Sequence, residues 1–126
     1  NDGHSPFPAP QMDALEALLH DRMARHGIPP QGVIGHSDCA PGRKIDPGKR
    51  FDWQRLARRG VAVWPRSVPA DPGAFRGHAR TFGYTSSVDD ETLLAAFRLR
   101  FRPGAQGPLD ATDAGLAADL AHRFPA

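Results

Sequence analysis

The chain has 126 residues, of which 40% are hydrophobic and 24% charged, as expected for one globular domain or a small domain with an appendage. Sixteen Lys and Arg against fourteen Asp and Glu give a formal net charge of +2. No basic block or interleaved aromatic motif accompanies this excess, which argues against nucleic-acid binding. No stretch approaches the roughly 18 apolar residues that a membrane-spanning helix needs.

A helix followed by a strand is predicted near the start of the chain. Residues 1–6 are predicted to form a turn or loop, and residues 11–26 a helix, because apolar side chains recur there at three- and four-residue spacing. Gly27 and the following prolines end this helix, and residues 32–36 are predicted to be a short buried strand. The predicted packing stripe of the helix consists of Met12, Leu15, Leu18, Leu19 and Met23.

A helix linked tightly to a strand is typical of an α/β layer, so residues 1–65 are predicted to form part of a mixed sheet flanked by helices. Residues 60–64 offer one further, weak strand candidate. A single strand cannot form a sheet, so its partners are expected from elsewhere. Between the two candidates, Asp52 is predicted to cap a short helix over residues 53–59.

The last part of the chain is predicted to be a small helical domain. Residues 66–71, which include one proline, are predicted to be a linker. Helices are predicted over residues 72–82, 91–101 and 111–123. A three-helix bundle of this size is marginal alone, so residues 72–126 are expected to dock onto residues 1–65. The arginines, Arg98, Arg100 and Arg102 among them, are predicted to lie on solvated helix faces.

The candidate site is the loop over residues 35–48, which is rich in glycine and proline. His36 and Asp46 are two zinc-ligand types ten residues apart, and Lys44 is a cation that can lie on the same side as Asp46 in an extended segment. A cation beside a metal site is suited to stabilising an oxyanion during amide hydrolysis. Spacing alone leaves two readings open, a metal site and an ordinary hydrogen-bonded loop.

The sequence from Gly35 to Asp38, and from Ala40 through Arg43 and Lys44 to Gly48, resembles the motif of zinc-dependent N-acetylmuramoyl-L-alanine amidases. These are the AmpD/AmiD-like enzymes of the amidase 2 family, which share a sheet flanked by helices with the peptidoglycan recognition proteins. The similarity covers residues 1 to about 65.

The resemblance implies that His36 and Asp46 bind Zn²⁺ and that Lys44 stabilises the transition state. The implied reaction is hydrolysis of the amide between N-acetylmuramic acid and L-alanine in peptidoglycan or muropeptides. Zinc would polarise the carbonyl and lower the pKa of bound water. For Arg43 two readings stay open, a substrate contact and an exposed structural arginine.

The chain departs from the family pattern because a third zinc ligand and a general base are missing. The family's central strand ends in a phrase similar to Asn1–His4, so the resemblance places both groups upstream of Asn1. The N-terminal half of the site is therefore expected from a second chain or from a further segment of the same protein. Cys39 and His4 are weaker substitutes for the missing ligand, and a single cysteine excludes an internal disulfide.

Three functions follow from these patterns. The first is a zinc amidase seen through its C-terminal half, followed by a helical domain that resembles peptidoglycan-binding modules in position and size. The second is a non-catalytic muropeptide-binding module, and the third, a DNA-binding helical protein, rests on the arginines alone. The sequence leaves open the cytoplasm, as in muropeptide recycling, and the periplasm or cell envelope.

Overall fold

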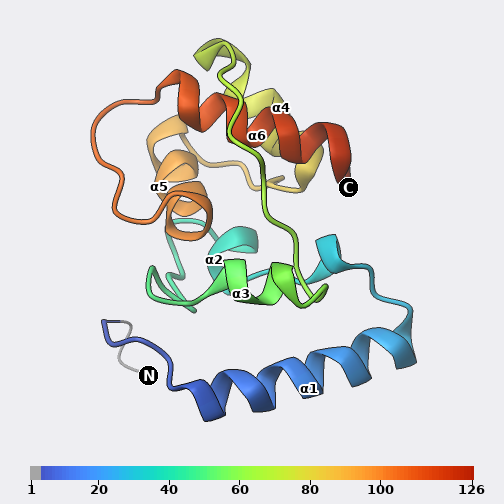
Figure 1. The fold of residues 1–126 in the computed structure, drawn as a ribbon. Coiled ribbons are helices and arrows are strands. Elements are labelled where there is room, and N and C mark those ends of the chain that lie inside the picture. The colour runs from blue at the N-terminus through green and yellow to red at the C-terminus, as the bar shows by residue number, and fades with distance from the viewer. Residues whose placement is uncertain (1–3) are drawn as a thin grey trace.

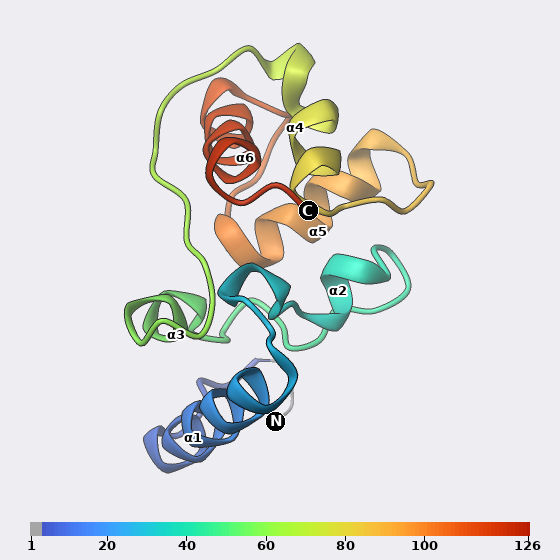
Figure 2. The same ribbon diagram turned by 90° about the vertical axis from the view of Figure 1, so that its right-hand side faces the viewer.

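The computed structural model describes residues 4–126, and all regular elements in this range are helical (Figure 1). Helix α1 lies at one end, α2 and α3 occupy the middle, and the last three helices pack together at the other end (Figures 1 and 2). The helices are α1 (Ala9–His26), α2 (His36–Cys39), α3 (Trp53–Arg58), α4 (Phe75–Phe82), α5 (Asp90–Phe101) and α6 (Ala111–Arg123), with 3₁₀ turns η1 (Pro30–Gly32) and η2 (Pro72–Ala74).

The predicted α/β fold with part of a mixed sheet is wrong for the described residues, because residues 4–126 contain no strand. The segment predicted as a strand over residues 32–36 begins in η1 and ends in α2, although the backbone between them is extended. Its backbone groups bond to side chains and to nearby turns instead of to a neighbouring strand. The Val33 carbonyl accepts from Arg100 Nη2 at 3.3 Å, and the Gly35 N–H donates to Asp38 Oδ2 at 2.8 Å.

The second strand candidate, residues 60–64, is also irregular. Val61 and Val63 are buried, but the Val61 N–H donates back to the Leu56 carbonyl at 3.0 Å. The Trp64 carbonyl accepts from Arg123 in α6 at 3.0 Å. The weak strand candidate is therefore wrong, because these backbone groups pair with a helix end and a side chain.

Helix α1 begins two residues earlier than predicted and ends at His26, where Gly27 adopts a left-handed conformation (φ 62°). Met12 is buried in a first core with Trp53, Leu56, Val61 and Ala62. The predicted stripe only partly packs, since Leu18 is 51% exposed. The loop predicted over residues 1–6 and the Asn1–His4 phrase fall largely outside the described residues.

The three predicted helices of the C-terminal region are confirmed. The first is observed as η2 continuing into α4, and the other two as α5 and α6. Their apolar faces form a second core, which also takes Val63 and Tyr84 from the connecting segments. The prediction of solvated arginines is wrong for Arg98 and Arg100, which are only 7% and 2% exposed.

The predicted linker, residues 66–71, runs against α6 rather than free of it. The Arg66 N–H donates to Asp119 at 2.7 Å, and the Ala70 N–H donates to the Ala111 carbonyl at 3.2 Å. Trp64, just before the linker, packs against both cores. Between residues 4 and 126, no helix is long and apolar enough to cross a membrane.

Candidate functional site

The site loop is closed by backbone hydrogen bonds that bring its two ends together. Helix α2 is a single turn, in which the Ala40 N–H donates to the His36 carbonyl at 2.9 Å. The chain then turns back, with the Lys44 N–H on the Ala40 carbonyl at 3.0 Å. The Ser37 N–H donates to the Asp46 carbonyl at 3.0 Å, so the residue after His36 is joined directly to Asp46.

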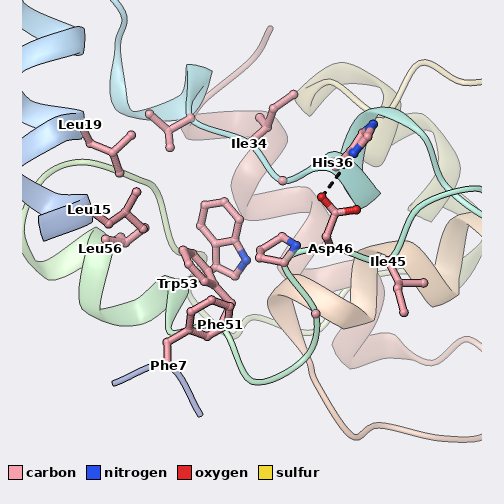
Figure 3. A pocket seen from close by; sticks show the side chains of 14 residues that line it. Phe7, Leu15, Leu19, Ile34, His36, Ile45, Asp46, Phe51, Trp53 and Leu56 are labelled. Carbon is pink, nitrogen blue, oxygen red and sulfur yellow. Dashed lines mark hydrogen bonds and ion pairs between the residues drawn. The ribbon is translucent and has the colours of Figure 1, made fainter. Parts of the chain in front are cut away.

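The structure brings the side chains of His36 and Asp46 together. His36 Nδ1 lies 3.3 Å from Asp46 Oδ2, with side-chain exposures of 48% and 65% (Figure 3). This distance is longer than the ordinary 2.9–3.0 Å of an N–H···O hydrogen bond. Two ligands that each lie about 2.0–2.1 Å from a tetrahedral zinc ion stand about 3.3 Å apart. The imidazole and carboxylate therefore fit two neighbouring positions of a zinc site.

No third ligand joins this pair within residues 4–126, where no group of three or more His, Cys, Asp and Glu side chains could hold a metal ion. The Cys39 thiol, one candidate for the third ligand, points to the His36 carbonyl oxygen at 3.5 Å. His4, the other candidate, belongs to no such group either. Within the described residues, His36 and Asp46 are therefore a pair of ligand-type side chains without a third beside them.

Lys44 and Arg43 are exposed and lie outside the cavity beside the pair. Neither side chain forms a hydrogen bond or ion pair with another described residue. The sequence grouped Lys44 with His36 and Asp46, but the structure brings only the latter two together.

A largely apolar groove of about 600 Å³ leads to the His36–Asp46 pair (Figure 3). Leu15 and Leu19 of α1 form one wall, and Trp53 and Leu56 of α3 form another. Ile45, beside Asp46, is 70% exposed. No pattern in the sequence pointed to this groove, since the spacing of Leu15 and Leu19 indicated only a packing face. The remaining lining residues are Phe7, Val33, Ile34, Gly35, Pro47, Gly48 and Phe51.

A buried carboxylate supports α2 on the side facing the C-terminal helices. Asp38 is 6% exposed, and its carboxylate accepts hydrogen bonds from the Tyr84 hydroxyl and from Arg100 Nη1, the latter at 2.8 Å. Burial, and then the charge of Asp38, raise the pKa of Tyr84 well above its ordinary value, so the hydroxyl stays protonated and donates. The sequence contained no local signal for this contact, because Asp38 and Arg100 are 62 residues apart.

Comparison with known proteins assigns this loop to a family. The profile of the N-acetylmuramoyl-L-alanine amidase family (amidase 2) matches residues 1–49, which contain His36 and Asp46. Together with the relatives described below, this match supports an AmpD/AmiD-like N-acetylmuramoyl-L-alanine amidase, the family that the motif of residues 35–48 resembled.

Two curated relatives illustrate the similarity. N-acetylmuramoyl-L-alanine amidase AmiD of Escherichia coli K12 is 32% identical over 95% of this chain and 50% of its own length. 1,6-Anhydro-N-acetylmuramyl-L-alanine amidase AmpD of Enterobacter cloacae is 39% identical over 41% of this chain and 28% of its own length. The chain thus spans half or less of the curated relatives that it matches.

Solved structures match nearly the whole chain. E. coli AmiD, in complex with anhydro-N-acetylmuramic acid-L-Ala-D-γ-Glu-L-Lys, superposes with a TM-score of 0.84 at 32% identity, covering 94% of this chain and 54% of AmiD. AMPDH3 of Pseudomonas aeruginosa superposes with a TM-score of 0.84 at 30% identity, covering 97% and 56%. Both matches extend beyond the site loop into the C-terminal helices.

Proposed function

We propose that this chain forms part of a zinc-dependent N-acetylmuramoyl-L-alanine amidase, which hydrolyses the amide between N-acetylmuramic acid and L-alanine in muropeptides or peptidoglycan. The observation that carries the proposal is the 3.3 Å approach of His36 Nδ1 to Asp46 Oδ2, inside the segment that matches the amidase family. The anhydromuropeptide bound to AmiD supports a muropeptide as the substrate class.

Each residue of the loop has a proposed role. His36 and Asp46 hold Zn²⁺, with neutral imidazole and carboxylate as the donor groups. When bound, zinc polarises a carbonyl and lowers the pKa of water. Lys44, whose side chain is exposed, neutralises negative charge on the amide oxygen. Arg43, which is also exposed, contacts the substrate.

The remaining zinc ligand and the general base are proposed to come from a segment outside these 126 residues, on the same chain or on a second one. The two-ligand set and its high exposure support this proposal. We call the chain together with this segment the complete protein. Full amidase activity from the 126 residues alone would contradict the need for such a segment.

Residues 1–65 are proposed to be the C-terminal half of the catalytic domain, with residues 66–71 as a linker and residues 72–126 as a helical domain that binds peptidoglycan. The extension of the AmiD and AMPDH3 matches across the helices supports a common arrangement.

The second candidate function, a non-catalytic muropeptide-binding module, is favoured by the presence of only two ligands within the described residues.

The complete protein should be incubated with anhydromuropeptide and, separately, with intact peptidoglycan, with and without a zinc chelator. Chelator-sensitive release of L-alanyl peptide supports the amidase. Binding of the muropeptide without release contradicts the amidase and supports the module, and the preferred substrate separates recycling from wall cleavage.

Variants assign the roles within the loop. His36→Ala and Asp46→Ala should each abolish stoichiometric zinc and reduce release of the peptide to background, whereas His20→Ala, on the exposed side of α1, should change neither. Lys44→Met should retain zinc and lower kcat by about 10²–10³-fold. Lys49→Met removes the same charge elsewhere in the loop region and is its matched control. An active His36→Ala protein with normal zinc content would contradict the assignment.

A further inference from the structure

Helix α2 has too few internal contacts to hold its own orientation. It spans only His36–Cys39, and helices of one turn are unstable in isolation because nucleation is costly. The backbone bond from Ser37 to Asp46 fixes one side of it. The remaining support must come from the structure packed behind α2, and the largest contribution there is made by the C-terminal helical region.

Asp38 is the link between α2 and that region. It lies two residues from His36 but is 6% exposed, whereas the His36 side chain is 48% exposed beside the groove. Both carboxylate oxygens of Asp38 accept hydrogen bonds. Oδ1 accepts from the Tyr84 hydroxyl, and Oδ2 accepts from the Gly35 N–H and from Arg100 Nη1, each at 2.8 Å. The carboxylate thus ties the N-terminal end of α2 to two residues of the helical region.

Arg100 holds several parts of the site region at once. Its side chain is 1% exposed, and while Nη1 binds Asp38, Nη2 donates to the Val33 carbonyl at 3.3 Å. The guanidinium lies over the Trp53 ring, 4.0 Å from its centroid, and Trp53 lines the groove. Within residues 4–126, the Nε–H has no hydrogen-bond acceptor. Arg100 therefore contacts the segment entering α2, α2 itself and the wall of the groove.

The opposite end of α2 is also attached to the helical region. The Ser86 hydroxyl donates to the Cys39 carbonyl at 3.2 Å. At Gly42, in the following turn, a Cβ would stand 2.8 Å from the Thr92 Cγ2 of α5, so this turn lies directly on that helix. Helix α2 is thus held at its start by Asp38 and at its end by Cys39, and both contacts lead to residues 84–100.

A buried ion pair is a poor means of gaining stability, because desolvation offsets most of the attraction and apolar replacements are often neutral. It is better suited to fixing the orientation of one element relative to another, since a guanidinium and a carboxylate pair in a restricted geometry. We propose that Asp38, Arg100 and Tyr84 are positioning residues, through which the C-terminal helical region sets the orientation of α2 and holds His36 beside Asp46. This inference rests on the proposed function for its catalytic consequence, but its structural part is independent.

Three variants of the complete protein test the proposal. Arg100→Met removes the charge and keeps an apolar side chain, and Tyr84→Phe removes only the hydroxyl. Arg98→Met is the matched control, because Arg98 lies on the same helix, is 9% exposed in its side chain and pairs with the fully buried Asp113 at 2.6 Å, without touching α2. Asp38 itself is left unchanged, since it lies within α2.

Two measurements distinguish positioning from general stability. Amide hydrogen exchange of residues 36–40 and the NMR resonances of the His36 ring report the order of α2 without any metal. Chelator competition gives the zinc affinity, which should fall about 10-fold or more in Arg100→Met, as for other residues that orient metal ligands, and less in Tyr84→Phe. Arg98→Met should lower Tm yet leave the exchange of residues 36–40, the His36 resonances and the zinc affinity unchanged.

The proposal is overturned if Arg100→Met and Arg98→Met change the exchange of residues 36–40 equally at matched stability, or if neither changes it. If Arg100→Met does not fold, Tyr84→Phe provides the test in its place. Unchanged amide exchange of residues 36–40 in folded Tyr84→Phe then also overturns the proposal. If the wild-type protein binds no zinc, the proposed function fails, while faster exchange of residues 36–40 in Tyr84→Phe still supports the positioning role.

Discussion

At Gly35 the backbone lies so close to Pro47 and Trp53 that a side chain has no room. A Cβ there would stand 2.8 Å from Pro47 Cδ and 3.3 Å from Trp53 Cζ2. Gly35→Ala should therefore displace Pro47, and with it the adjacent Asp46, and should destabilise the protein by about 1–3 kcal/mol, as overpacking does. Denaturant unfolding measures the stability, and chelator competition measures the accompanying loss of zinc affinity.

Gly77 provides the control for this substitution. It lies in α4, and a Cβ at this position would have no neighbour within 4 Å. Gly77→Ala should therefore be stabilising by about 0.5–1 kcal/mol, because alanine is the better helix former. Equal effects of the two substitutions would show that the close approach at Gly35 does not matter.

The buried Tyr84 should make the stability of the protein fall at alkaline pH. Burial raises its pKa well above the ordinary 10.0, so the folded state keeps a proton that the unfolded state loses. This contribution to stability is complete below pH 10 and is lost as the pH rises further. Tyr84 is the only tyrosine, so the tyrosinate absorbance should appear together with unfolding. Titration of the folded protein at its ordinary pKa would contradict the buried placement.

At the scale of elements, the helices follow from local sequence and the supposed strands do not. The spacing of apolar residues and the stop at Gly27 predicted α1, and similar patterns predicted α4, α5 and α6, because helical hydrogen bonds join neighbours in sequence. A strand needs a partner that local sequence does not specify. The extended residues before His36 instead pair with Arg100, and nothing near either residue in the sequence indicates that contact.

The start of α6 shows how a local motif contributes to stability. Asp110 caps the helix by accepting from the Asp113 N–H at 3.0 Å, and Arg102 Nη1 donates to both of its oxygens at 2.8 Å. The Arg102 bond, followed by the Asp113 N–H, lowers the pKa of Asp110 to about 2. Because the folded-state pKa is depressed, the carboxylate stabilises the protein above its ordinary pKa, and this stabilisation is lost as the pH falls towards 2.

Two substitutions separate the cap from the charge. Asp110→Ala should destabilise the protein by about 1 kcal/mol at pH 7, while Asp110→Asn keeps a capping oxygen and should cost less. The Asp110 side chain is 47% exposed, so its ion pair with Arg102 is worth less than about 1 kcal/mol. In thermal unfolding, the difference between Asp110→Asn and wild type should shrink as the pH falls towards 2 and vanish below it. A difference that persists there would contradict the role of the charge.

At the scale of the whole molecule, residues 72–126 contact residues 4–65, as expected for a small bundle that is marginal alone. Apart from the Asp38–Arg100 contact, the linker itself lies on α6, where a Cβ at Gly115 would stand 1.5 Å from the Val68 carbonyl oxygen. Gly115→Ala should therefore push the linker off the helix and destabilise the protein by more than about 2 kcal/mol. Thermal unfolding checks this, and a near-neutral effect would show that the linker is free to move.

The approach of His36 to Asp46 was predictable from the sequence because it is local. His36 and Asp46 belong to one short motif, and a loop of ten residues is able to bring both together. Lys44 was grouped with them because of its place in that motif, but its side chain does not line the groove beside the pair. The groove and the Arg100 contact were not predictable, because they depend on how distant helices pack around the loop.

Anomalous diffraction at the zinc edge, from crystals of the complete protein grown with zinc, tests the central claim most directly. We predict a peak within about 2.0–2.2 Å of both His36 Nδ1 and an Asp46 carboxylate oxygen, with further ligands from the completing segment. If His36 Nδ1 and Asp46 Oδ2 instead lie 3.3 Å apart with no anomalous density between them, this result would contradict the assignment of the loop as a zinc amidase site.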